Sequence, residues 1–148
     1  MPDKDHDKLL ALYNAQLLAL SARADHDARL PNPAYTAHAV SPICGSTVDI
    51  DFNLDSTGKI TALGFAVEAC ALTKAVIGAL VVHAPGKTTG DVLAAGMVLQ
   101  KMLADENVTW PAAWQVLRIL EPVRDYKARH NAIMLPFEAI EKALKNKT

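Results

Sequence analysis

The sequence predicts an α+β fold, in which an N-terminal helix precedes a small three-stranded antiparallel sheet and a run of helices packs on one face of that sheet. Hydrophobic periodicity is helical before residue 28 and after residue 70, and it alternates like a strand in between. Elements segregated in this way are typical of α+β domains, and a length of 148 residues suits one domain. We therefore expect a single domain over residues 1–148, with a helix at 7–28, a sheet at 35–69 and a helical part at 70–146.

The N-terminal helix is predicted by apolar residues that recur at spacings of three and four. Asp7 is placed to cap this helix, and Pro31 and Pro33 prevent it from continuing further. Its apolar residues are Leu9, Leu12, Tyr13, Leu17 and Leu20.

The sheet is predicted by strict alternation around residues 47–54. Val48, Ile50, Phe52 and Leu54 alternate with polar residues, so one face of this strand meets the core and the other meets water. We expect the acidic side chains on that wet face, Asp49 and Asp51 with Asp55 beyond them, to be solvated. They lack the loop spacing and final glutamate of a calcium-binding EF-hand.

A hairpin follows at the turn 55–58, and its second strand carries Leu63, Phe65 and Val67 on one face. Ile60 is out of phase with these residues, which indicates either a bulge near Gly64 or an irregular start of the strand. Residues 35–40 supply the third predicted strand.

Helices are expected from residue 70 to the end. Residues 71–82 are apolar on almost every side, which indicates a buried helix. Thr88 or Thr89 is placed to cap the next helix, after the break at Pro85 and Gly86. A further helix begins at Trp110, carries Trp114, Leu117 and Leu120 on one side and is interrupted at Pro122, and the last helix covers residues 128–144.

Composition excludes several classes of protein. A net charge of −1 argues against a dedicated nucleic-acid binder, and a longest apolar run of eight residues, 75–82, is far short of the ~20 that cross a membrane. Two cysteines cannot form a disulfide framework or a four-cysteine zinc site. The polar, acidic N-terminus lacks the pattern of a secretory signal, so we expect a cytoplasmic protein with reduced thiols.

The two cysteines are the main candidates for chemistry. Cys44 precedes the first strand of the hairpin, and Cys70 ends the second strand and begins a helix, where the free N–H groups stabilise a thiolate. Because the strands are antiparallel, both cysteines should reach the same edge of the sheet. They could also be two small buried residues, or a thiol–disulfide pair if their Cα atoms lie within about 7 Å. No nucleophile, base and orienting group assemble from the sequence, so we do not expect an enzyme.

Four segments together resemble the scaffold proteins of iron–sulfur cluster assembly, the family of NifU N-terminal domains, IscU and SufU. They are the turn Cys44-Gly45-Ser46, the stretch around Cys70, the loop Gly86-Lys87-Thr88 and residues 128–135 at the start of the last helix. The resemblance covers roughly residues 30–145. It implies the SufE/NifU-like fold, a cysteine desulfurase and cluster-transfer proteins as partners, and no role for nucleic acid or a membrane.

The chain departs from the family pattern at two positions. Ser46 stands where the family has aspartate, and Ala132 stands where it has a third cysteine. The resemblance therefore implies a reduced site that binds iron, a [2Fe–2S] cluster or zinc at Cys44 and Cys70, with Ser46 and His130 as further metal ligands. The site could also bind nothing. The chain would then be a metal-free interaction module that docks a cysteine desulfurase or a chaperone.

Overall fold

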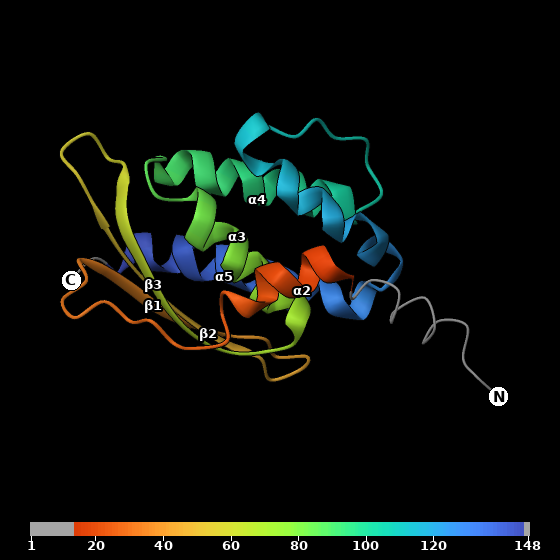
Figure 1. The fold of residues 1–148 in the computed structure, drawn as a ribbon, viewed down its shortest axis with the longest axis horizontal. Helices are drawn as coiled ribbons and strands as arrows, with labels where there is room; N and C mark the ends of the chain where they lie inside the picture. The colour runs from red at the N-terminus through yellow and green to blue at the C-terminus, as the bar shows by residue number, and fades with distance from the viewer. Residues whose placement is uncertain (1–13, 147–148) are drawn as a thin grey trace.

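The computed structural model describes residues 14–146 and confirms the α+β class (Figure 1). Its sheet has three antiparallel strands in the order β1-β2-β3. The elements in chain order are α2 (Ala15–Ala22), β1 (Tyr35–Val40), β2 (Thr47–Leu54), β3 (Ile60–Glu68), α3 (Ala71–His83), α4 (Thr89–Leu103), the 3-10 helix η1 (Ala112–Asp125) and α5 (Lys127–Lys145).

The helices lie over one face of the sheet. Helix α5 packs on β1 and β2, α3 packs beside it and reaches β3, and α4 and η1 lie on the other side of α3 and α5 (Figure 1). Helix α2 crosses α3 at Gly78, where an added Cβ would come within 2.0 Å of the Leu20 carbonyl oxygen. The core therefore lies between the sheet and α3 and α5, and Val48, Ile50, Phe52, Leu72, Leu80 and Ile140 are among its fully buried residues.

The expectation of an N-terminal helix over 7–28 is wrong at its C-terminal end. Helix α2 ends at Ala22, while Asp7, Leu9, Leu12 and Tyr13 lie outside the described residues. The chain leaves the helix because Ala28 pairs with Phe65, with both N–H groups donating to the opposite carbonyl at 2.8 and 3.1 Å. A short extended segment thus continues the sheet beyond β3, and it cannot be helical at the same time.

The hairpin register shows where the second strand is irregular. Leu54 pairs with Ile60 and Asn53 pairs with Ala62, so Thr61 is the extra residue on β3. The alternative of an irregular start is confirmed, whereas Gly64 pairs regularly with Asp51. Gly64 has another role: an added Cβ would lie 2.7 Å from the Ala28 carbonyl oxygen and the Leu30 nitrogen. Glycine is required there because residues 28–30 cross directly over it.

Three helix predictions after residue 70 are confirmed, and one differs. Thr88 caps α4, since its hydroxyl accepts from the Asp91 N–H at 3.1 Å and the Asp91 carboxylate accepts from the Thr88 N–H. The helix expected from Trp110 is a 3-10 helix that continues through Pro122. Its buried residues Trp114, Leu117, Leu120 and Val123 are spaced by three. A spacing of three matches the 3.0 residues per turn of a 3-10 helix, so each turn places an apolar side chain on the core.

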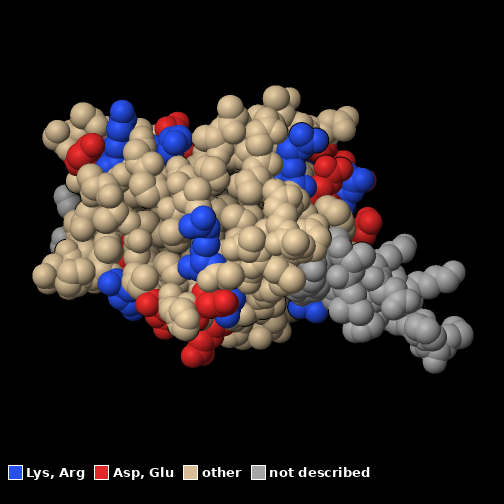
Figure 2. Space-filling view, viewed as in Figure 1, with Lys and Arg blue, Asp and Glu red and all other residues tan. Residues whose placement is uncertain are grey.

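None of the helices described within residues 14–146 has the length and apolar character to cross a membrane. On the face shown in Figure 2, acidic and basic side chains are interspersed, and neither sign forms a large patch. This mixed surface agrees with the net charge of −1.

Candidate functional site

Both cysteines line one open pocket at the edge of the sheet. The pocket has a volume of about 590 Å³ and is formed by the β1–β2 loop, the junction between β3 and α3, and the first turns of α5. Cys44 and Ser46 come from the loop, Cys70 from the junction and Ala132 from α5. The hairpin has therefore brought together two thiols that are 26 residues apart in the sequence, as expected from its antiparallel strands.

A tight loop presents Cys44 to solvent. The Ser41 N–H donates to the Ser46 carbonyl at 2.8 Å, and the Gly45 N–H donates to the Ser41 carbonyl at 2.9 Å. Gly45 has a φ of 75°, which a residue with a side chain rarely adopts. Ser41 is buried and its hydroxyl donates to Asn131 Oδ1 at 2.5 Å, which fixes the loop to α5. The thiol of Cys44 is exposed at the tip of this hydrogen-bonded turn.

The surroundings of Cys44 favour its thiolate. Hydrogen bonds from Ser41 and then from Ser46 lower the pKa of Cys44 from 9.0 to about 7. The Ser46 hydroxyl lies 3.0 Å from Cys44 Sγ. A large share of this thiol is therefore ionised at neutral pH, and the thiolate is the form that binds metals and attacks electrophiles.

Cys70 is the N-cap residue of α3 and is half-buried. Its Sγ lies 3.6 Å from the hydroxyl oxygen of Thr73, one turn into the helix. Thr73 is fully buried, and its hydroxyl donates to the Ala132 carbonyl at 3.0 Å. One threonine thus connects the second cysteine to the part of α5 that carries Ala132, so the relative positions of Cys70 and Ala132 are fixed.

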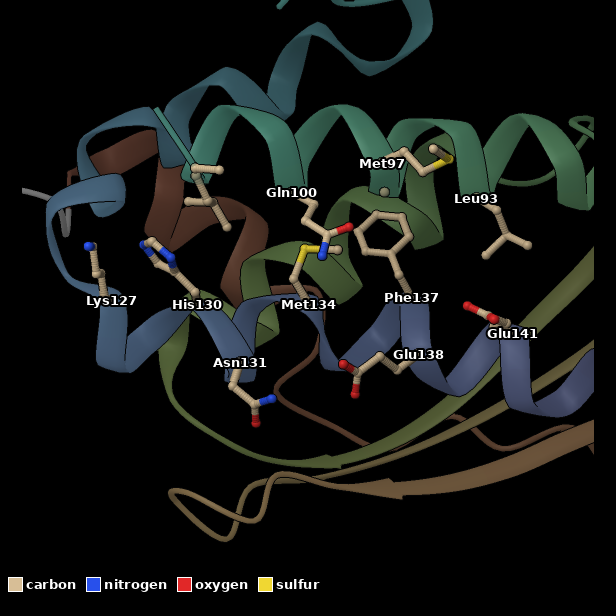
Figure 3. A pocket seen from close by; sticks show the side chains of 13 residues that line it. Leu93, Met97, Gln100, Lys127, His130, Asn131, Met134, Phe137, Glu138 and Glu141 are labelled. Atoms are coloured by element: carbon tan, nitrogen blue, oxygen red, sulfur yellow. The ribbon is translucent and has the colours of Figure 1, made fainter. Parts of the chain in front are cut away.

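His130 is not brought to the cysteines. It lines a separate groove of about 780 Å³ between α4 and α5, with Met97, Met134 and Phe137 (Figure 3). Its Nε2 lies at hydrogen-bond distance, 2.9 Å, from the Val123 carbonyl oxygen. The expectation that His130 adds a nitrogen ligand was based on a sequence separation of two from Ala132. On α5 two residues apart means different faces, and Ala132 faces the cysteine pocket.

Two further residues of the cysteine pocket were not identified from the sequence. Glu68 is the last residue of β3, and Arg129 lies on α5 one turn before Ala132. The signal for Arg129 was its spacing of three from Ala132, because residues three apart share a helix face. The pocket therefore carries one acidic and one basic side chain besides its two thiols.

Within residues 14–146, no group of three or more His, Cys, Asp or Glu side chains is arranged to hold a metal ion. The side chains in the pocket that could donate to a metal are the thiols of Cys44 and Cys70, the carboxylate of Glu68 and the hydroxyl of Ser46. Two thiolates suit the metals that cluster proteins and zinc sites use, but they are half of the four ligands that either centre requires.

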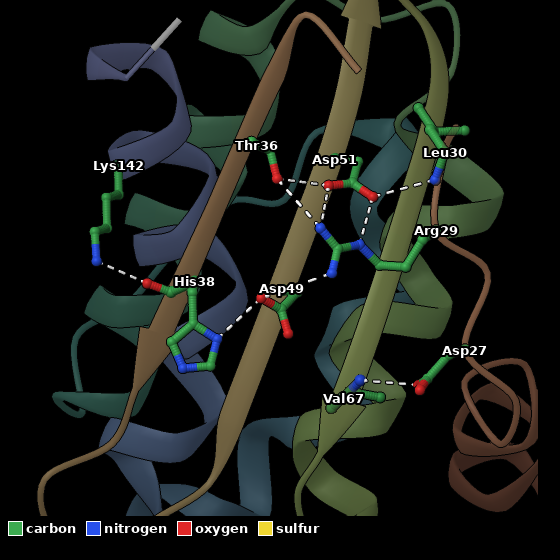
Figure 4. A network of polar contacts seen from close by, with 9 residues as sticks. All are labelled: Asp27, Arg29, Leu30, Thr36, His38, Asp49, Asp51, Val67 and Lys142. Atoms are coloured by element: carbon green, nitrogen blue, oxygen red, sulfur yellow. Dashed lines mark hydrogen bonds and ion pairs between the residues drawn. The ribbon is translucent and has the colours of Figure 1, made fainter. Parts of the chain in front are cut away.

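A second polar cluster lies on the opposite face of the sheet and corrects the interpretation of Asp51 as a solvated residue (Figure 4). Asp51 is fully buried and accepts from Arg29 at 2.6 and 3.0 Å, from the Thr36 hydroxyl at 2.7 Å and from the Leu30 N–H at 3.1 Å. Burial opposes its ionisation, but these hydrogen bonds and the charge of Arg29 outweigh burial and lower the pKa of Asp51. Every oxygen is occupied by the protein, so this cluster holds residues 29–30 on the sheet.

Comparisons with known proteins identify solved structures of similar fold. No protein-family model and no curated protein matches the chain. The N-terminal part of a nitrogen-fixing NifU-like protein from Brucella abortus is 28% identical, with a TM-score of 0.85 over 93% of this chain and 95% of that one. A protein described as an iron–sulfur cluster assembly scaffold of the SUF system from Fervidobacterium islandicum AW-1 is 20% identical, with a TM-score of 0.81 over 90% of this chain and 97% of that one.

The likeness extends over almost the whole length of the compared chains. The resemblance inferred from short sequence motifs is therefore confirmed by the arrangement of the whole domain. The chain has the fold of the NifU-like N-terminal domain and of the SufU scaffold protein.

Proposed function

We propose that this protein is an iron–sulfur cluster assembly scaffold that binds iron, a [2Fe–2S] cluster or zinc at Cys44 and Cys70. One observation carries the proposal: the two cysteines of the chain line one open pocket. Ala132, the position at which the family that the chain resembles has its third cysteine, lines the same pocket. The Brucella abortus NifU-like protein and the SufU scaffold share the fold that creates this pocket. Fold alone does not assign function, so the proposal depends on the pocket.

The pocket suits a cargo that is bound and later released. Cys44 needs little free energy to lose its proton at neutral pH, because its pKa is about 7. Cys70 supplies the second sulfur from a fixed helix start, and each thiol that is still protonated releases one proton on binding. The open mouth of the pocket leaves the bound iron or cluster accessible to an acceptor protein, as a scaffold requires. The proposal assigns no catalytic residue to the chain.

Anaerobic reconstitution with ferrous iron and sulfide tests this proposal. The wild-type protein should gain visible absorption, with bound iron in a fixed ratio to protein, and both Cys44→Ala and Cys70→Ala should lose it. Ser56→Ala, in the exposed turn between β2 and β3, is the matched control and should behave as wild type. A wild-type protein that stays colourless and binds no stoichiometric iron or zinc would contradict the metal site.

Two further variants test what His130 and Ser46 contribute to metal binding. His130→Ala should retain the absorption, because His130 lines the other groove and bonds to Val123. Ser46→Ala should weaken metal retention against a chelator, because it removes a hydrogen bond that stabilises the Cys44 thiolate. Loss of metal in His130→Ala with the fold intact would show that His130 is a ligand after all.

The second candidate function is a metal-free module that docks a cysteine desulfurase or a chaperone. Ala132 in place of a cysteine favours it, and so does Ile43, which is 67% exposed beside Cys44. A binding assay with a purified cysteine desulfurase in a non-thiol reductant, with metal measured on the same sample, separates the two functions. Equal binding by wild type and Cys44→Ala, with no metal in either, supports the docking module.

A further inference from the structure

A groove between α4 and α5 lies apart from the cysteine pocket, and no residue among 14–146 lines both. It has a volume of about 780 Å³ and runs along the two helices, which are antiparallel (Figure 3). Gly96 lets the helices approach closely, because an added Cβ there would lie 2.7 Å from the Phe137 ring. The buried side chain of Phe137 therefore forms the floor of this α4–α5 groove.

The walls of the α4–α5 groove are apolar and adaptable along its middle. Met97 is 59% exposed, and Leu93 and Met134 are half-buried in the same groove. A methionine side chain rotates about three bonds and ends in a polarizable thioether, so it adapts to the apolar groups that reach it. Apolar side chains gathered in an open groove mark an interaction site, and an amphipathic helix can lay an apolar stripe along such a groove. The groove therefore suits the apolar face of a helix.

The α4–α5 groove carries opposite charges at its two ends. Lys127 is exposed at the end next to η1, whereas Glu138 and Glu141 are exposed towards the other end (Figure 3). Within residues 14–146, neither Lys127 nor Glu138 belongs to an ion pair, and Glu141 has a 3.8 Å contact with the exposed Lys145. Because like charges across an interface repel, these ends select a partner that is acidic near Lys127 and basic near Glu141.

We propose that the α4–α5 groove binds an amphipathic helix of a partner protein that is acidic at one end and basic at the other. The apolar face of this helix contacts Met97 and Met134. Its acidic end pairs with Lys127, and its basic end pairs with Glu138 and Glu141. Glu141 lies 14 positions after Lys127 on α5, so at a rise of ~1.5 Å per residue the bound helix has about four turns. The inference goes beyond the proposed function, because the metal site uses other residues.

Three synthetic helical peptides of about 15 residues test the charge of the partner. All three carry leucines at spacings of three and four. The mixed peptide is acidic in its first turn and basic in its last turn, the second peptide is acidic at both ends, and the third is basic at both ends. In fluorescence anisotropy the mixed peptide should bind with saturation. The other two should bind at least about tenfold more weakly, because each places like charges together at one end of the groove.

Two pairs of variants test whether the peptide binds in the groove. Lys127→Glu makes both ends acidic, so this variant should prefer the all-basic peptide to the mixed one. Lys59→Glu, in the exposed turn between β2 and β3, changes the net charge equally and should keep the wild-type preference. Met97→Lys should weaken binding of the mixed peptide at least about tenfold, because it buries an unpaired charge in the apolar wall. Val82→Lys, at an exposed apolar residue of α3 outside the groove, is its matched control.

The methyl signals of methionine locate the bound peptide independently of its affinity. Met97 and Met134 line the groove, whereas Met102 is 3% exposed and does not line it. In protein labelled with ¹³C at the methionine methyl groups, the mixed peptide should shift the NMR signals of Met97 and Met134 and leave the signal of Met102 in place. Met97→Leu and Met134→Leu each remove one signal and so assign it.

Three results would overturn the inference. They are equal affinity for the three peptides, no saturable binding of the mixed peptide, and unchanged signals of Met97 and Met134 when it binds. Signals of these two methionines that move on dilution of the peptide-free protein would instead assign the groove to a second copy of the chain, and would also overturn it. All samples are freed of metal with a chelator. A failure here therefore leaves the metal site at Cys44 and Cys70 standing, and a failed reconstitution of that site leaves the groove standing.

Discussion

At the scale of single residues, the thiol of Cys44 combines exposure with a lowered pKa. It is exposed, and hydrogen bonds from Ser41 and Ser46 hold its pKa at about 7. Cys70 is half-buried at the N-cap of α3. Ser46 does not need to bind metal to influence this site, because its hydroxyl lies 3.0 Å from Cys44 Sγ.

We predict that alkylation of Cys44 titrates near neutral pH. In the single-cysteine variant Cys70→Ser, the rate of reaction with iodoacetamide should rise with pH around a midpoint of about 7, because the thiolate is the nucleophile. Adding Ser46→Ala should move the midpoint upward, since one stabilising hydrogen bond is lost. Stopped-flow or mass-spectrometric rates between pH 5 and 10 measure it. A midpoint that stays unchanged in Ser46→Ala would show that Ser46 does not stabilise this thiolate.

The ion pair between Asp51 and Arg29 holds residues 29–30 on the sheet. Asp51 has a pKa below its ordinary value of 3.8 in the folded protein. Its contribution to stability is therefore complete above about pH 4 and is lost as the pH falls through the folded pKa. Arg29 is 46% exposed and stays hydrated when its partner is changed.

We predict that Asp51→Asn lowers the free energy of unfolding at pH 7 by about 2 kcal/mol, less than the ~3–5 kcal/mol for a fully buried broken pair. The deficit relative to wild type should shrink at pH 3, because the Asp51 carboxyl of the unfolded wild-type chain, with its ordinary pKa of 3.8, is then protonated and the unfolded state is stabilised. Urea unfolding at both pH values measures the deficit. An equal deficit at pH 7 and pH 3 would mean that the ionised form of Asp51 is not what stabilises the fold.

At the scale of elements, the crossing of residues 28–30 over β3 depends on the absence of one methyl group. A Cβ at Gly64 would lie 2.7 Å from two backbone atoms, the Ala28 oxygen and the Leu30 nitrogen. Backbone cannot rotate away as a flexible side chain can. The segment, its two hydrogen bonds to Phe65 and the Asp51 cluster would have to shift together.

We predict that Gly64→Ala destabilises the protein by about 2 kcal/mol, which lies within the range of overpacked substitutions. Gly90→Ala, in the first turn of α4, is the matched control, because its nearest neighbour would be the Thr88 hydroxyl at 3.7 Å. It should be neutral or slightly stabilising, since alanine favours a helix. Thermal and urea unfolding compare the two. Equal stability of both variants would show that the segment tolerates a side chain at Gly64.

Hydrophobic periodicity predicted most elements, because each strand or helix buries one side of a regular pattern. It gave β2, the hairpin, α3, α4 and α5 close to their observed positions. It failed where a long-range contact decides the conformation. The pairing of Ala28 with Phe65 ends the helical region early, and Arg29 converts Asp51 from a wet-face residue into a buried one. Arg29 and Asp51 lie 22 residues apart, so no local sequence pattern contains both partners of this ion pair.

The sequence likewise predicted only part of the candidate site. Antiparallel pairing places Cys44 and Cys70 at one edge, so their meeting follows from topology alone. The direction of His130 depends on helix phase, and a separation of two from Ala132 turns it toward α4. Glu68 and Arg129 became visible as pocket residues only when three separate elements were assembled.

At the scale of the whole molecule, the fold brings a small residue of α5 to the pocket that the two cysteines line. Ala132 is 2% exposed on α5 and lines the cysteine pocket. The contact of its carbonyl with Thr73 fixes that turn of α5 relative to Cys70. The backbone at position 132 is therefore held in place beside the cysteine pocket.

We predict that Ala132→Cys strengthens metal binding at the proposed site. The added Sγ would lie in the pocket that Cys44 and Cys70 line, so cobalt should be retained about tenfold more tightly against a chelator than by the wild-type protein. Ala132→Ser is the matched control for side-chain size, and it should retain cobalt as the wild type does, because a neutral hydroxyl is a weak ligand. Equal retention by Ala132→Cys and the wild-type protein would show that position 132 does not place a ligand at the metal.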